Sequence, residues 1–285
     1  MTRVSVIGMG TMGAAMARRL LDTDIEVTVW ARRSASTKPL AEQGATAHEL
    51  PTDAVRNADV VISMLPTAEA TAQVMFDDSV VEAMRSGAIW VQMATIGVEQ
   101  TEQLAAESQE RRPEVSFVDA PVSGSRIPAE QGQLLVLASG PPEAEQPLRP
   151  VFAALGRDTL WLGAAGAGSR LKLILNTWLA FQTEGAAESA ALADRLGVSS
   201  EALFDALRGN PLASPYALSK LTKMVDQNFD ADFALDWALK DLDLVASAAD
   251  PAVAPIASAI AERWRGLVHQ GASGLDVSAA RRGLN

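Results

Sequence analysis

The sequence predicts an α/β protein in two parts, a doubly wound parallel sheet followed by an all-helical segment. In the first half, short apolar runs typical of buried strands alternate with helical patterns. After about residue 165 the strand patterns stop, and long Ala- and Leu-rich helical patterns follow one another to the end. We therefore predict domains over residues 1–163 and 164–285, with the boundary beside the glycine-containing segment "GAAGAG".

The individual elements follow from the same patterns. The predicted strands are rich in Val and Ile and cover residues 4–7, 27–30, 60–65, 89–93, 117–118 and 134–138. Helices are expected between them at residues 12–20 and 99–107. In the second half, helices are expected at residues 171–196, 201–207, 233–248 and 252–268.

Composition excludes several kinds of protein. The 285 residues are 48% hydrophobic and 21% charged, as in folded globular domains. No cysteine is present, which excludes disulfides and thiolate chemistry, and the two histidines, His48 and His269, lie far apart, so no metal site is predicted. The net charge of −11 argues against nucleic acid as a partner. Without a leader-like segment or a membrane-length apolar run, we expect a cytoplasmic protein with no membrane contact.

The segment "SVIGMGTMGAAMARRL" carries a G-x-G-x-x-G motif between a predicted strand and a predicted helix. Gly8, Gly10 and Gly13 allow a sharp turn, close approach of a pyrophosphate and close packing of the helix. Thr11 and Met12, where the helix is expected to start, are also predicted to bind the cofactor, because the helix N-terminus would face the phosphates. Glycine-rich turns also serve packing alone, but this context predicts a Rossmann dinucleotide-binding domain.

The second predicted strand ends in "VTVWARRSAST". An NAD-specific domain usually presents an acidic residue there to bind the ribose 2′-hydroxyl. Arg32 and Arg33 stand there instead, with Ser34 beside them, and two guanidinium groups suit a 2′-phosphate. The turn therefore predicts NADP(H) as cofactor; a solvated basic turn is the alternative.

Five segments of the chain form a recognisable series: "VIGMGTMGAAMARRL", "DVVISMLPT", "DAPVSGSRIPAEQGQLLVLASG", "GAGSRLKLILN" and "FALDWALKDLDL". In order and spacing they resemble the β-hydroxyacid dehydrogenases, the family of 3-hydroxyisobutyrate dehydrogenase and the glyoxylate/succinic semialdehyde reductases. The resemblance covers nearly the whole chain. It implies an oxidoreductase that transfers a hydride between NADP(H) and a small β-hydroxyacid or semialdehyde.

The resemblance implies that Lys172 is the catalytic residue, because Gly166, Gly168 and Lys172 reproduce the spacing of the family's motif. An ammonium suits carbonyl reduction, since it stabilises the developing alkoxide and supplies a proton. Taken without the family, a single lysine on a helix is usually a surface residue.

The substrate residues are also implied by the resemblance. Ser123, Gly124 and Ser125 match the loop that binds the substrate carboxylate, and a serine hydroxyl with successive N–H groups can hold an anion. Asn176 matches the second asparagine of the lysine motif, one helical turn after the lysine. Leu175 replaces the first asparagine, which removes a polar contact and favours a substrate with an apolar portion.

The remaining cofactor positions come from the same comparison of motifs. Leu65 and Pro66 match the segment against the adenine-side ribose, and Thr95 matches the residue near the nicotinamide ribose. Lys240 matches a lysine that reaches the cofactor, with a solvated helix lysine as the alternative. Trp178 and Phe181 are expected in the protein core.

The sequence thus predicts an NADPH-dependent reductase or dehydrogenase that forms a homodimer or homotetramer. Two other readings stay open. An imine or ketone reductase of the related imine reductase branch would share the architecture, although Lys172 argues against it. A non-catalytic NADP-binding module would keep the glycines and arginines and lose the lysine, whereas this chain has the lysine as well.

Overall fold

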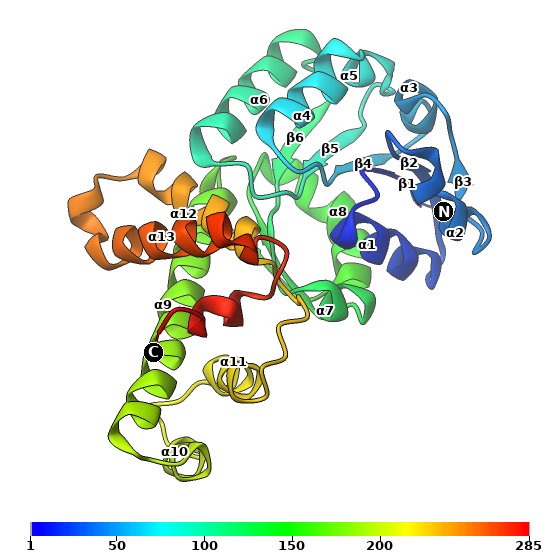
Figure 1. Cartoon of the computed structure of the whole chain (residues 1–285). Coiled ribbons are helices and arrows are strands. Elements are labelled where there is room, and N and C mark those ends of the chain that lie inside the picture. The colour runs from blue at the N-terminus through cyan, green and yellow to red at the C-terminus, as the bar shows by residue number, and fades with distance from the viewer. Residues whose placement is uncertain (1, 285) are drawn as a thin grey trace. The chain divides into compact units, whose positions relative to one another are not determined.

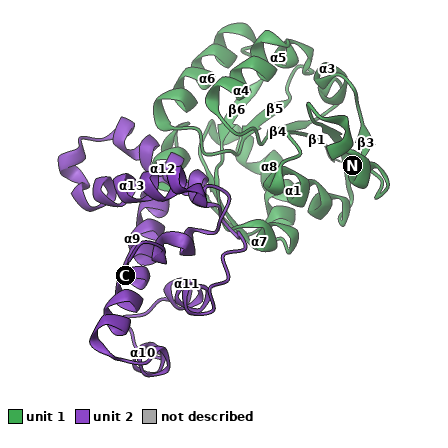
Figure 2. Ribbon diagram, viewed as in Figure 1, with its two compact units in different colours: residues 1–172 green, residues 173–285 purple. Residues whose placement is uncertain are grey.

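The computed structural model describes residues 2–284 (Figure 1). The chain forms two compact units, residues 1–172 and 173–285 (Figure 2), and each is described by itself. The first contains a parallel sheet with helices and the second is helical, so the predicted fold class is confirmed. The domain boundary predicted between residues 163 and 164 stays a prediction.

The first unit is built on a six-stranded parallel sheet in the order β3-β2-β1-β4-β5-β6. The strands are β1 (Thr2–Ile7), β2 (Ile25–Trp30), β3 (Thr46–Ala47), β4 (Val60–Ser63), β5 (Ile89–Gln92) and β6 (Ser116–Asp119). Val4 of β1 lies opposite Val27 of β2 on one side and Val60 of β4 on the other. The strand order reverses between β1 and β4, and in such sheets ligands bind at the carboxyl edge beside that point.

Helices cover both faces of this sheet (Figure 1). They are α1 (Thr11–Leu21), η1 (Ser34–Ser36), α2 (Lys38–Ala41), α3 (Pro51–Val55), α4 (Ala68–Ala72), η2 (Gln73–Asp77), α5 (Val80–Ala83) and α6 (Val98–Arg111). Successive strand residues enter opposite cores, because side chains alternate along a strand. Ile62 packs in the core that includes Met16 of α1, and Val61 packs in the core that includes Leu104 of α6.

A second, three-stranded sheet follows in the first unit, in the order β7-β8-β9. Its elements are β7 (Val122–Ser123), α7 (Arg126–Glu130), β8 (Leu134–Ala138), η3 (Pro142–Ala144), α8 (Glu145–Leu155) and β9 (Gly156–Trp161). β7 runs antiparallel to β8, and β9 runs parallel to it. Of these strands the sequence predicted β8 only, because β7 has two residues and none of the residues of β9 is buried.

The helical unit is organised around α9 (Ala167–Leu196), which begins in the first unit. The others are α10 (Ser200–Leu207), α11 (Pro215–Val225), α12 (Leu235–Ala248), η4 (Pro251–Val253), α13 (Pro255–Leu267), η5 (Val268–Ala272) and η6 (Val277–Arg281). α11 was not predicted from the sequence, although Ser214 caps it and Pro215 opens it. Trp264 is completely buried in the core of this unit. Among the helices described, none combines the length and apolar character needed to cross a membrane.

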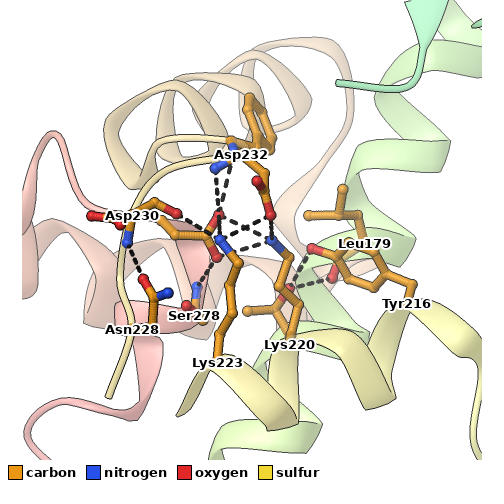
Figure 3. Close-up of polar contacts among 11 residues, drawn as sticks. Leu179, Tyr216, Lys220, Lys223, Asn228, Asp230, Asp232 and Ser278 are labelled. Atoms are coloured by element: carbon orange, nitrogen blue, oxygen red, sulfur yellow. Dashed lines mark hydrogen bonds and ion pairs between the residues drawn. The ribbon is translucent and has the colours of Figure 1, made fainter. Parts of the chain in front are cut away.

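A buried ion pair joins α11 to the segments around it in the helical unit (Figure 3). The Nζ of Lys220 lies 2.9 Å from Oδ1 of Asp276, and the residues are 4% and 0% exposed. Lys223, one helical turn nearer the end of α11, pairs with Asp232 at 2.9 Å. Together these pairs connect α11 with the segment that leads into α12 and with the start of η6.

Candidate active site

The cofactor residues predicted in the first unit lie at one edge of its sheet. Gly8 follows β1, Arg32 follows β2, Leu65 follows β4 and Thr95 follows β5. Because these strands are parallel, all four positions are at the carboxyl edge, on both sides of the point where the strand order reverses. The fold therefore brings together residues that are up to 87 positions apart in the sequence.

The glycine turn has the geometry that its motif requires. Gly8 has φ +106°, and a Cβ there would lie 2.5 Å from the carbonyl oxygen of Met64. A Cβ on Gly13 would lie 1.9 Å from the carbonyl oxygen of Gly8, so only glycine allows α1 to pack this closely. Gly10, in contrast, faces open space and caps α1 without a side-chain hydrogen bond. Thr11 and Met12 follow it in the first turn, and this uncapped turn fits a pyrophosphate.

Arg32 and Arg33 form an exposed basic turn after β2. Among residues 2–284 neither guanidinium takes part in an ion pair. Ser34 opens η1 directly afterwards, and its carbonyl oxygen accepts a 2.8 Å hydrogen bond from the hydroxyl of Thr37. Two cationic groups on a braced turn fit an anionic 2′-phosphate.

The loops after β4 and β5 carry the predicted cofactor residues Leu65, Pro66 and Thr95, and different contacts fix each loop. Leu65 is buried in the core on one face of the sheet, and Pro66 is exposed. Thr95 is half-buried, in a turn that the buried side chain of Gln92 braces. The Gln92 amide donates to the carbonyl oxygen of Ala94 at 2.7 Å, and its oxygen accepts from the Ala94 N–H at 2.8 Å. This bracing gives Thr95 a defined position at the carboxyl edge.

The predicted substrate loop connects β7 with α7 in the first unit. Ser123 ends β7, Gly124 has φ +130°, and Ser125 is the residue before α7. A Cβ on Gly124 would lie 2.8 Å from a methyl carbon of Leu134, so the turn requires glycine. The side chain of Ser125 makes no capping bond to α7. Two half-buried serines beside an exposed glycine backbone fit the binding of a carboxylate.

Lys172 is half-buried on α9, and the first turn of this helix is attached to the end of β6. Asp119, the last residue of β6, accepts hydrogen bonds from the backbone N–H and the hydroxyl of Ser169, both at 2.8 Å. Burial raises the pKa of Asp119, and the hydrogen bonds from Ser169 and Ser139 act against that rise. Asp119 was not predicted as a site residue from the sequence, although it opens the motif "DAPVSGS".

In the helical unit, Asp241 connects two predicted site residues. Asn176 is buried and its side-chain amide donates to Oδ2 of Asp241. The Nζ of Lys240 lies 3.0 Å from Oδ1 of the same carboxylate and 5.7 Å from the ring centre of Trp237. Asp241 is 3% exposed. Asp241 was not predicted as a site residue from the sequence, although it follows Lys240 directly in "FALDWALKDLDL".

The apolar residues of α9 occupy different environments. Leu175 is half-buried, and Phe181 is half-buried against the core of the helical unit. Trp178 is 61% exposed, so the expectation that it belongs to the core is wrong. The physical reason is helical geometry, since Trp178 lies about 200° around the helix from the buried Asn176.

The strand order, the glycine turn and the uncapped start of α1 define a dinucleotide-binding domain of the Rossmann type. Comparison with known families identifies both parts of the chain. Residues 3–163 match the NAD-binding domain of 6-phosphogluconate dehydrogenase, and residues 166–284 match the NAD-binding family of NADP-dependent 3-hydroxyisobutyrate dehydrogenase. The chain belongs to the β-hydroxyacid dehydrogenase family.

Individual relatives agree with this assignment. Glyoxylate/succinic semialdehyde reductase 1 of Arabidopsis thaliana is 33% identical over 281 residues, which cover 97% of this chain and 96% of that protein. The structure of Mycobacterium tuberculosis 3-hydroxyisobutyrate dehydrogenase with L-serine matches with a TM-score of 0.90 at 28% identity, covering 100% of this chain and 99% of that one. An imine reductase from Myxococcus stipitatus shares the fold at a TM-score of 0.68 and 21% identity, with both chains covered completely.

Proposed function

We propose that this protein is an NADPH-dependent reductase of a small carbonyl compound that carries a carboxylate, and the corresponding NADP-dependent 3-hydroxyacid dehydrogenase in the reverse direction. The observation that carries the cofactor choice is the exposed pair Arg32 and Arg33 after β2, neither of which forms an ion pair among residues 2–284. Each guanidinium can bind a phosphate through two parallel hydrogen bonds. A 2′-phosphate would therefore distinguish NADP(H) from NAD(H) at this turn.

Each candidate residue has a chemical task in this proposal. Bound NADPH would supply the hydride. The ammonium of Lys172 donates a proton to the carbonyl oxygen of the substrate and stabilises its developing negative charge. Ser123 holds the substrate carboxylate through its hydroxyl, together with the backbone N–H groups of Gly124 and Ser125. Asn176 orients the substrate, and Lys240 contacts the cofactor; in the helical unit Asp241 holds both side chains in place.

The substrate class follows from Leu175. A leucine can offer no hydrogen bond, and a polar group left unpaired against it costs about 1 to 3 kcal/mol. We therefore expect a substrate whose carboxylate binds the Ser123–Gly124–Ser125 loop and whose apolar portion contacts Leu175. A longer-chain semialdehyde fits this description better than glyoxylate or tartronate semialdehyde.

A substrate panel tests the proposed function. Small aldehydes, keto acids, ketones and cyclic imines are assayed by the oxidation of NADPH, and the active substrates are repeated with NADH. We expect reduction of carboxylate-bearing aldehydes with NADPH. Reduction of cyclic imines alone would identify an imine reductase instead. NADPH binding without reduction of any compound would identify a non-catalytic binding module.

The Lys172→Ala variant tests the assignment of the proton donor. General acid catalysis contributes about 10² to 10⁴ in rate, so kcat is expected to fall by that range. Binding of NADPH, measured by fluorescence titration, is expected to stay within about twofold of wild type, because Lys172 acts on the substrate. A variant with wild-type kcat would remove Lys172 from the mechanism.

We also propose that the protein is a cytoplasmic homodimer or homotetramer in which a second copy covers one face of α9. Ile174, Trp178, Leu192 and Leu196 share that face and are 58% to 74% exposed. Trp178→Glu is expected to shift the mass measured by light scattering towards the monomer. Leu212→Glu is the control, because Leu212 is 86% exposed but lies outside α9. An unchanged mass for Trp178→Glu would show that this face is not the interface.

A further inference from the structure

Asp119 is a fully buried carboxylate to which the proposed reaction assigns no chemical step. Its Oδ2 accepts from the Ser169 N–H at 2.8 Å and from the Ser139 hydroxyl at 3.1 Å. Its Oδ1 accepts from the Ser169 hydroxyl at 2.8 Å. All three partners can donate, and an ionised carboxylate only accepts, so the surroundings match the charged form. A buried charge of this kind is tolerated because it is fully hydrogen-bonded.

Two of these three bonds come from the first turn of α9. The free N–H groups at a helix N-terminus carry partial positive charge and attract a carboxylate. The N–H of Gly168 is satisfied in the same way, by the hydroxyl of Ser139 at 2.9 Å. Asp119, the last residue of β6, and Ser139, the residue after β8, lie opposite each other in an antiparallel β-bridge. The start of α9 is therefore bonded to both sheets of the first unit.

Steric contacts reinforce this attachment. A Cβ on Gly168 would lie 2.1 Å from the carbonyl oxygen of Leu137, so the α9 backbone lies directly against β8. On another side, the hydroxyl of Thr101 in α6 lies 3.2 Å from that of Ser169. The first turn of α9 is thus held from β6, β8 and α6 at once, and Asp119 supplies the charged group at the centre of these contacts.

We propose that Asp119 is a positioning residue that sets the place of the Lys172 ammonium by fixing the first turn of α9. The inference rests on the proposed role of Lys172. Ser169 and Lys172 are three residues apart on the helix, so they lie on adjacent turns of one face. Any displacement of Ser169 therefore moves Lys172 with it. A misplacement of about 1 Å costs about a hundredfold in rate when a catalytic group must meet a reacting atom.

The test compares Asp119→Asn with a matched carboxylate in the same unit. Asn keeps the shape of the side chain but removes the negative charge and leaves a single oxygen, so the N–H and the hydroxyl of Ser169 can no longer donate to two separate oxygens. Asp59→Asn is the control: Asp59 precedes β4 at the opposite edge of the sheet, and its carboxylate also accepts from a backbone N–H, that of Arg3 at 3.0 Å. Ser169→Ala is the milder variant of the attachment, because it removes only the hydroxyl bonds, and it decides the question if Asp119→Asn does not fold.

The first measurement is hydrogen exchange of peptides that cover residues 166–175, which requires no activity. We expect faster exchange there in Asp119→Asn and Ser169→Ala and unchanged exchange in Asp59→Asn. Unchanged exchange in both variants of the attachment would overturn the inference, whatever the role of Lys172.

The second measurement is a double-variant cycle with Lys172→Ala. With saturating NADPH, Asp119→Asn is expected to lower kcat about tenfold to a hundredfold and Ser169→Ala about threefold to tenfold. NADPH affinity should stay within about twofold. In the Lys172→Ala background the effect of Asp119→Asn should shrink to within about twofold, because its target is gone. The same loss in both backgrounds would show that Asp119 acts elsewhere. A normal kcat for Lys172→Ala alone would refute the proposed function, and the positioning inference with it.

Discussion

Replacing Lys220 by methionine removes the buried cation that pairs with the Asp276 carboxylate in the helical unit. In the wild-type protein the Lys220 Nζ lies 2.9 and 3.0 Å from the two carboxylate oxygens of Asp276. The same carboxylate accepts from the backbone N–H groups of Asp232 at 3.0 Å, Phe233 at 3.3 Å and Ser278 at 3.0 Å. Burial acts to raise the pKa of Asp276, but the Ser278 N–H and Lys220 outweigh it and hold the pKa below its ordinary value.

The size of the loss follows from this environment. Breaking a buried ion pair by removing one partner costs about 3 to 5 kcal/mol. Here the three backbone donors remain, and the Lys223 Nζ lies 3.9 Å from Asp276 Oδ2, so part of the charge stays compensated. We therefore expect Lys220→Met to lower the free energy of unfolding by about 3 kcal/mol, at the low end of that range.

Two further variants test whether the loss in Lys220→Met comes from the unpaired charge of Asp276. Lys223→Met removes the neighbouring ammonium, whose partner Asp232 has a side chain that is 41% exposed, and is expected to cost about 1 kcal/mol or less. Adding Asp276→Asn to Lys220→Met removes the unpaired charge and should recover about 1 to 2 kcal/mol.

The assay is equilibrium unfolding in urea, followed by circular dichroism and by tryptophan fluorescence. Coincidence of the two transitions is required before a single free energy is taken from them. Equal losses for Lys220→Met and Lys223→Met would refute the reasoning, because burial would then not distinguish the two lysines. A loss below about 1 kcal/mol for Lys220→Met would refute it as well.

Three further predictions concern the cofactor, the substrate and pH. Arg32→Ala should lower kcat/KM for NADPH about tenfold and leave that for NADH nearly unchanged, as steady-state kinetics with both cofactors would show. Leu175→Asn should raise kcat/KM for small polar acids relative to longer apolar ones, and a constant ratio would mean that Leu175 does not contact substrate. Hydrogen bonds from Arg3 lower the pKa of Asp59 from 3.8 to about 2, so its stabilisation is present above pH 3.8 and lost as pH falls towards 2. Asp59→Asn should remove about 1 kcal/mol at pH 7, reduced by solvent screening, and flatten the stability curve across that range; parallel curves for variant and wild type would contradict this.

The sequence by itself determined the class of fold and placed the proposed cofactor positions after predicted strands. Five of the six strands of the parallel sheet were predictable, because buried parallel strands are continuous apolar runs and need no information from elsewhere in the chain. β3 was not predicted, because it has only two residues and both are exposed. The turn from Gly8 to Gly13 was predictable because its glycines form one short motif between a strand and a helix. The assignment of Arg32 and Arg33 to a turn also needed only the end of the preceding strand.

Local patterns were less informative where elements are short or exposed. β7 has only two residues, and β9 has no buried residue, so neither shows an apolar pattern that distinguishes it from a loop. α11 was not recognised, although its start carries a serine cap and a proline. Trp178 was assigned to the core because large aromatic residues are usually buried, whereas helical phase places it on the exposed face of α9.

Only the tertiary structure decided which polar groups meet in the interior. Asp119 contacts Ser169 across 50 positions, Lys220 contacts Asp276 across 56, and Asn176 contacts Asp241 across 65. Such pairs have no signature in sequence spacing, because each partner lies on a different element. The pairs exist because a charge or amide buried by the packing of apolar neighbours must find a hydrogen-bonding partner in the space that the fold leaves to it.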